Sequence, residues 1–69
     1  MTIHPLTKKI GNNVRTIRKS KKITVRKLAA MCKLDYANLS RFENGWQDIR
    51  ITTLNDIAEK LEIDIKDLL

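Results

Sequence analysis

The sequence predicts a compact all-α domain built from five short helices. Its apolar residues recur at spacings of three and four, which places them along one face of successive helical segments. Short polar stretches separate these segments, three of them end in a residue that can cap the next helix, and none of the segments is predicted to be a strand. With 69 residues and no visible linker or repeat, the chain has room for one domain. We therefore expect a single domain over residues 1–69, with residues 1–5 as a loose N-terminal arm.

The first predicted helix begins at Thr7 or in the turn before it, and it ends near Ser20 or Lys21. Basic side chains cover its outer faces, which makes it amphipathic. Its apolar stripe is formed by Leu6, Ile10, Val14 and Ile17.

The next two predicted helices cover residues 25–32 and about 36–44, with three residues between them. Thr24 and Asp35 carry short side-chain oxygens that cap free N–H groups at helix starts. Gly45 supplies the left-handed residue that commonly ends a helix. Two helices joined by so short a turn, the second with a polar outer face, have the outline of a helix-turn-helix.

A polar connector at residues 46–50 leads to a fourth helical stripe between Ile51 and Leu61. Asp64 then caps a fifth, short helix over residues 65–69, in which Ile65, Leu68 and Leu69 are expected to face inward. The predicted core combines apolar residues from all five helices. It consists of Leu6, Ile10, Val14, Ile17, Leu28, Ala29, Cys32, Leu34, Leu39, Phe42, Leu54, Ile57, Ala58, Leu61, Ile63 and Leu68.

The charge of the chain is strongly asymmetric. Residues 1–34 carry ten basic side chains and no acidic one, whereas residues 35–69 carry four basic and eight acidic side chains. A one-sided positive field attracts polyanions, and nucleic acid is the commonest of them. The alternative is that the lysines only solvate the outer faces of the helices.

Several other classes of protein are disfavoured. His4 and Cys32 are single, no nucleophile–base pair can be placed together, and no residues have metal-ligand spacing. We therefore expect no enzyme, no metal and no cofactor. The longest apolar run is five residues, 28–32, and the N-terminus lacks an apolar signal segment. These features predict no membrane association and a cytoplasmic, nucleoid-associated location, and an unpaired cysteine suits a reducing compartment.

Two runs carry a resemblance to a known family: TVRKLAAMCKLDYANLSRFENG at residues 24–45 and LNDIAEKLEIDIKDLL at residues 54–69. Together they resemble the lambda-repressor-like, Cro-type or xenobiotic-response-element (XRE) family of bacterial and phage regulators. The resemblance implies a five-helix fold and sequence-specific binding of a double-stranded DNA operator, with a homodimer on the DNA. Some members of this family are antitoxins or adaptors, so a protein-interaction module with a toxin or polymerase as partner is the alternative.

The sequence departs from the family pattern at several positions. Lys22, Lys33 and Glu62 stand where family members often have glycine. If these residues keep a left-handed backbone, each costs roughly 1 kcal/mol relative to glycine. Val25 replaces a usual glutamine and Arg50 a usual serine cap, which alters the expected phosphate contacts.

The helix-turn-helix predicts which residues meet DNA, because the start of its second helix enters the major groove. The expected base contacts are Tyr36, Ala37, Asn38 and Arg41. Asparagine pairs with adenine and arginine with guanine, although Arg41 taken alone is equally well explained as a solvated side chain. The expected phosphate contacts are Thr24, Lys33, Asn44, Gln47 and Arg50.

Two further expectations concern structure and assembly. The resemblance implies a buried ion pair between Arg18 and Glu43, and a carboxylate near a helix C-terminus also needs a cation. For a homodimer, the expected interface is an apolar patch left outside the core. Its candidates are Ile49, Ile51, Ile65 and Leu69, with Trp46 nearby.

Overall fold

The computed structural model describes residues 4–69, which form four α-helices and one closing 3₁₀ turn. These elements are α1 (Pro5–Ser20), α2 (Val25–Cys32), α3 (Tyr36–Glu43), α4 (Ile51–Lys60) and η1 (Ile65–Leu68). The expectation of five α-helices is therefore wrong at the last element. A segment of four residues completes i→i+3 hydrogen bonds but is too short for a ladder of i→i+4 bonds.

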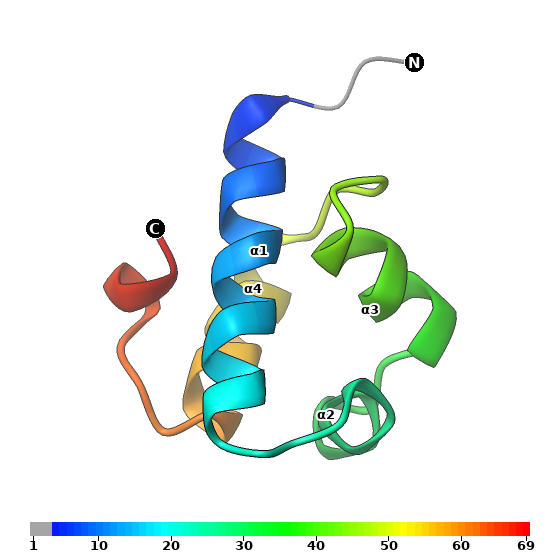
Figure 1. Cartoon of the computed structure of the whole chain (residues 1–69), viewed down its shortest axis with the longest axis vertical. Coiled ribbons are helices and arrows are strands. Elements are labelled where there is room, and N and C mark those ends of the chain that lie inside the picture. Colours follow the sequence, from blue (N-terminus) through cyan, green and yellow to red (C-terminus); the bar gives the residue numbers. More distant parts are fainter. Residues whose placement is uncertain (1–3) are drawn as a thin grey trace.

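The helix α1 runs the length of the molecule, as Figure 1 shows, with α3 on one side and η1 on the other. The helix α3 packs on α1 and α2, α2 also packs on α4, and η1 closes over α4 and α1. The predicted core forms between these elements. Its fully buried members of largest volume are Val14, Leu28, Leu39, Phe42, Leu54, Ile57, Leu61 and Leu68.

The start of α1 lies in the turn before Thr7, within the expected arm. The helix begins at Pro5, because the His4 side chain caps it by accepting a hydrogen bond from the Leu6 N–H at 3.0 Å. Proline suits this first position because its fixed φ is already helical. Residues 4 and 5 of the expected arm are therefore part of the helix start, and residues 1–3 lie outside the described residues.

The buried face of α1 is also rotated from the predicted stripe. It consists of Thr7, Ile10, Gly11, Val14 and Arg18. Leu6 is 51% exposed, so its place in the predicted core is wrong. Thr7 is buried in its place and donates a hydrogen bond from its hydroxyl to Asp48 at 3.1 Å.

Other predicted core residues lie at the edge of the core. Ile17, Leu34 and Ile63 are partly buried and pack against the buried cluster. Leu69 is 50% exposed, so the expectation that it faces inward is wrong. The turn η1 buries Leu68, as predicted, and the Asn13 side-chain amide donates a 2.9 Å hydrogen bond to the Leu68 carbonyl.

Three turns keep a left-handed backbone without glycine. Lys22, Lys33 and Glu62 have φ angles of 59°, 56° and 60°, and each follows the end of a helix. The family's glycine positions therefore keep their backbone shape here, at a cost of roughly 1 kcal/mol each.

One glycine allows α1 and α3 to approach closely. A Cβ atom added at Gly11 would overlap the Phe42 carbonyl oxygen and lie 3.3 Å from the Glu43 Cα atom. Only a residue without a side chain fits between these two backbones, so Gly11 sets the distance between α1 and the end of α3.

Candidate nucleic-acid interface

The segment from Thr24 to Gly45 forms the predicted helix-turn-helix. The Thr24 hydroxyl oxygen accepts from the Lys27 N–H at 3.1 Å, and the Asp35 carboxylate accepts from the Asn38 N–H at 3.2 Å. Both caps are as predicted, because each needs only residues within three positions along the chain. Between the two helices, Lys33 adopts a left-handed backbone conformation, which turns the chain from α2 into α3.

The end of α3 is closed by the glycine predicted to end it. Gly45 has a φ of 76°, and the Trp46 N–H bonds to the Arg41 carbonyl at 2.8 Å, as in a Schellman motif. This closure sends the chain sharply away from α3 and leaves the Trp46 indole 76% exposed.

A buried ion pair ties α3 to α1. The Arg18 Nε and Nη2 groups each donate a 2.8 Å hydrogen bond to one carboxylate oxygen of Glu43. The remaining Nη1 donates to the Ile23 carbonyl at 2.7 Å, in the turn before α2. The expected pair is therefore present. It joins α1, the α1–α2 turn and the end of α3, so that the orientation of α3 is held from the side opposite its polar face.

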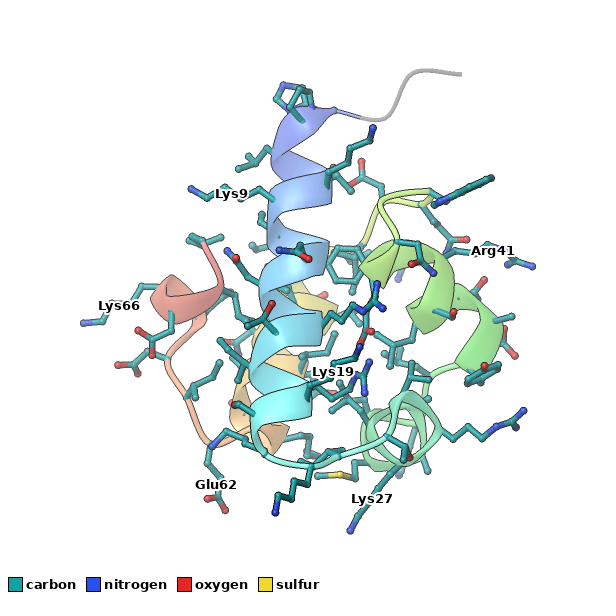
Figure 2. All side chains as sticks on the ribbon, viewed as in Figure 1. Lys9, Lys19, Lys27, Arg41, Glu62 and Lys66 are labelled. Atoms are coloured by element: carbon teal, nitrogen blue, oxygen red, sulfur yellow. The ribbon has the colours of Figure 1, made fainter. Side chains whose placement is uncertain are left out.

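The polar face of α3 presents the predicted base-contacting side chains. Tyr36, Asn38 and Arg41 are exposed, whereas Ala37 is half-buried. Figure 2 shows Arg41 projecting from α3 on the side away from α1. The Arg41 Nη1 group donates to the Asn38 amide oxygen at 3.1 Å, which orders the two side chains relative to each other.

The predicted phosphate-contacting residues lie at the ends of the elements that border α3. Thr24 stands at the start of α2, Lys33 in the turn, and Asn44 after α3. Arg50 precedes α4 and forms no side-chain cap, as its residue type predicts. The side-chain amide of Asn44 donates a 2.9 Å hydrogen bond to the Ser40 carbonyl of α3.

A surface cavity of about 420 Å³ brings part of these residues together between α3 and the start of α4. Asn38, Gln47 and Arg50 line it together with the apolar side chains of Phe42 and Ile49. The polar side chains converge there around a space that is open to solvent. Thr24 and Lys33 do not line this cavity and border α3 from the side of α2.

The structure shows a contact between α2 and α3 that the sequence did not predict. The guanidinium carbon of Arg26, on α2, lies 4.3 Å from the centre of the Tyr36 ring, on α3. The only local signal was a basic residue in the first turn of a helix, where acidic residues are preferred. The stack joins residues on two helices, so spacing within one helix does not reveal it.

Two of the four residues predicted for a dimer interface line different hollows of the surface. Ile49 lines the cavity beside α3, whereas Ile65 lines a separate hollow between α4 and η1. Both are partly buried against the core, whereas Ile51 is 64% exposed and Leu69 is largely exposed. Ile49 is therefore a poor candidate for an interface that includes Ile65.

No group of three potential metal-ligating side chains occurs within residues 4–69. Cys32 is buried, and this burial, together with the nearby negative charge of Asp56, raises the pKa of its thiol. The side chain is thus a small apolar core group at neutral pH. Within the same residues, no helix has the length and apolar character needed to span a membrane.

The capped helix pair, the anchored α3 and the exposed polar side chains define a helix-turn-helix DNA-binding domain. The chain belongs to the family of Cro/C1-type HTH DNA-binding domains, whose model matches residues 13–69. It is accordingly a DNA-binding transcriptional regulator. This class is defined by binding to DNA and not by catalysis.

Solved structures of regulators share the fold. The clp gene regulator ClgR from Corynebacterium glutamicum has a TM-score of 0.90 and 24% identity, covering 97% of this chain and 71% of that one. The restriction-modification controller protein C.AhdI from Aeromonas hydrophila has a TM-score of 0.87 and 24% identity, over 91% of this chain and 96% of its own. The biofilm regulator SinR, solved in complex with DNA, has a TM-score of 0.80 and 25% identity, over 86% and 95% respectively. No curated protein sequence gives a significant match.

Proposed function

We propose that the protein reads a specific operator by inserting α3 into the DNA major groove, and that two copies bind two half-sites. The observation that carries this proposal is the combination of a buried anchor and a free polar face on one helix. Glu43 is tied to Arg18 on the inner side, and Asn38 and Arg41 are exposed on the outer side.

The exposed residues have the chemistry needed to distinguish bases. A guanidinium donates two hydrogen bonds to guanine O6 and N7, and a carboxamide pairs with adenine N6 and N7. Arg41 and Asn38 are one turn apart and already hydrogen-bonded to each other, which lowers the entropy lost when they bind. Ala37 and Tyr36 complete the proposed base-contacting set, with alanine suited to a thymine methyl group.

Thr24, Lys33, Asn44, Gln47 and Arg50 are the proposed phosphate contacts. Thr24 and Arg50 precede α2 and α4, whose first backbone N–H groups also favour anions, whereas Lys33 and Asn44 follow the ends of α2 and α3 and Gln47 lies in the connector before α4. Contacts of this kind set the position of α3 on the duplex without reading the sequence.

The proposal of two copies follows from the size of the reading surface. One recognition helix contacts too few base pairs for useful specificity, and paired half-sites lie about 34–36 Å apart. Ile51, Ile65 and Leu69 are the proposed contacts between copies, because Ile51 on α4 and Leu69 after η1 are exposed and Ile65 on η1 lines a surface hollow. Such a regulator would act in the cytoplasm, on the nucleoid.

The experiment that tests this function is selection of bound sites from a random duplex pool, followed by titration of the selected duplex at several salt concentrations. We expect a palindromic pair of short sites and a log–log slope of about −0.9 per phosphate neutralised. Binding that does not change with salt, or no enrichment of any sequence, would argue for an antitoxin or adaptor with a protein partner.

A further inference from the structure

We propose that Arg26 is an additional phosphate-binding residue and that the Tyr36 ring positions its side chain for this role. The inference rests on the proposed function and extends it to a contact that spans the two helices of the motif. It starts from the 4.3 Å separation between the Arg26 guanidinium carbon and the centre of the Tyr36 ring.

The stack leaves the hydrogen-bonding groups of Arg26 available. A cation over an aromatic ring interacts through the face of the guanidinium, whereas its five N–H donors point outward within its plane. No carboxylate within residues 4–69 forms an ion pair with Arg26, and its side chain is exposed. The charge is therefore ordered by Tyr36 without being neutralised.

The position of Arg26 on α2 also indicates an anionic ligand. It lies in the first turn, where the helix dipole disfavours a cation, and that turn contains no acidic residue. The side chain thus stands at a place where it does not stabilise the helix that carries it. A phosphate would interact favourably with both the guanidinium and the free N–H groups of this turn.

The location of the pair fits the DNA backbone rather than a base. In a helix-turn-helix the first helix crosses the sugar–phosphate backbone, and the start of the second helix enters the groove. Arg26 belongs to the first of these helices and Tyr36 begins the second. One face of the Tyr36 ring is occupied by Arg26, which leaves the ring edge, the hydroxyl group and the other face for contact with DNA.

The test compares Arg26→Ala in three backgrounds: the wild type, Tyr36→Phe and Tyr36→Leu. Each protein is titrated with the selected operator duplex and a scrambled duplex from low to physiological salt. In the wild type and in Tyr36→Phe, we expect Arg26→Ala to weaken binding to both duplexes about fivefold at 0.15 M salt, and to make the salt slope shallower by about 0.9. In Tyr36→Leu, where the ring is absent, we expect Arg26→Ala to weaken DNA binding only about twofold or less. An exposed cation–π contact changes an equilibrium constant by about two- to fivefold, and this contribution is already lost in Tyr36→Leu.

Lys27→Ala is the matched control. It removes one positive charge from the neighbouring position of the same helix, but Lys27 projects away from α3 (Figure 2) and lines a hollow with Met31 and Lys60. We expect it to change the salt slope by much less than 0.9. Helical circular dichroism of every variant establishes that the fold is kept.

The outcomes separate the two proposals. If the wild-type protein does not prefer the selected duplex over the scrambled one, the proposed operator binding fails and Arg26 has no such role. If the wild type binds selectively but Arg26→Ala behaves like Lys27→Ala, only the phosphate contact is overturned. If Arg26→Ala weakens DNA binding by the same factor in all three backgrounds, Tyr36 does not position the Arg26 side chain.

Discussion

Arg18 and Glu43 join α1 to the last turn of α3 through two parallel 2.8 Å hydrogen bonds, with both side chains buried. This geometry uses the planar fork of the guanidinium against both carboxylate oxygens. The third donor of Arg18 reaches the Ile23 carbonyl, so one side chain connects three segments. The recognition helix is thereby held by an interaction that uses none of its exposed side chains.

The first prediction concerns removal of this anchor. Glu43→Ala should lower the free energy of unfolding by roughly 3–5 kcal/mol, because Arg18 is left buried without its counter-charge. This loss approaches the whole stability of so small a domain, at roughly 0.05–0.15 kcal/mol per residue. The measurement is the urea midpoint. The double variant Arg18→Met, Glu43→Leu should recover much of the loss, and a midpoint for Glu43→Ala equal to that of the wild type would contradict the prediction.

The second prediction concerns the left-handed turns. The double variant Lys22→Gly, Glu62→Gly should be more stable by about 1 kcal/mol per site, because glycine adopts positive φ without steric cost. The net charge stays unchanged, since one residue of each sign is removed. Thermal unfolding should show a rise in Tm of about 4–8 °C per kcal/mol.

Lys19→Gly is the control for this pair, because Lys19 lies within α1 where glycine destabilises by about 1 kcal/mol. A double variant that melts below the wild type would show that the lysine and glutamate side chains stabilise their turns by more than the backbone strain costs.

The third prediction concerns the close approach of α1 and α3. Inside a helix, glycine to alanine normally gains up to about 1 kcal/mol. Gly11→Ala should instead lower stability, because the added Cβ overlaps the Phe42 carbonyl and overpacking of this kind costs typically 1–3 kcal/mol. Asn12→Ala, at the exposed neighbouring position, should raise stability by up to about 0.7 kcal/mol, because alanine has the higher helix propensity. A Gly11→Ala protein that is more stable than the wild type would place the two backbones further apart.

The fourth prediction separates base contacts from phosphate contacts. Arg41→Ala should relax the preference at one base pair of the selected operator, at a cost of roughly 1–3 kcal/mol. Lys33→Ala should weaken binding to all duplexes about equally, because phosphates are the same in every sequence. Titration of a panel of single-base operator variants measures both effects. If Arg41→Ala weakens every duplex by the same factor, Arg41 contacts phosphate.

The fifth prediction concerns assembly on DNA. Ile51→Asp should weaken binding to a two-site operator and abolish cooperativity between half-sites, because it places a charge in the proposed apolar contact. Thr52→Asp adds the same charge at the next exposed position of α4 and serves as the control. The measurement is the binding curve on one-site and two-site duplexes. Equal effects of the two variants on both duplexes would exclude Ile51 from a contact between copies.

The elements of the helix-turn-helix were predictable from the sequence because their signals are local. Thr24 and Asp35 cap backbone N–H groups three residues away, and Gly45 adopts the positive φ that closes α3. The resemblance to the family supplied the pairing of Arg18 with Glu43, which spacing alone does not reveal. The residues proposed to meet DNA follow from the motif in the same way and await the binding experiments.

Where α2 and α3 begin and how they are joined follows from the sequence, because capping and helical periodicity act within a few residues. Two features became clear only in the packed fold: α1 buries Thr7 rather than Leu6, and Arg26 lies over Tyr36. Each of these depends on contacts between segments far apart in the chain or on different helices. Close packing selects one rotation of α1 and one separation from α3 out of several that the apolar pattern allows.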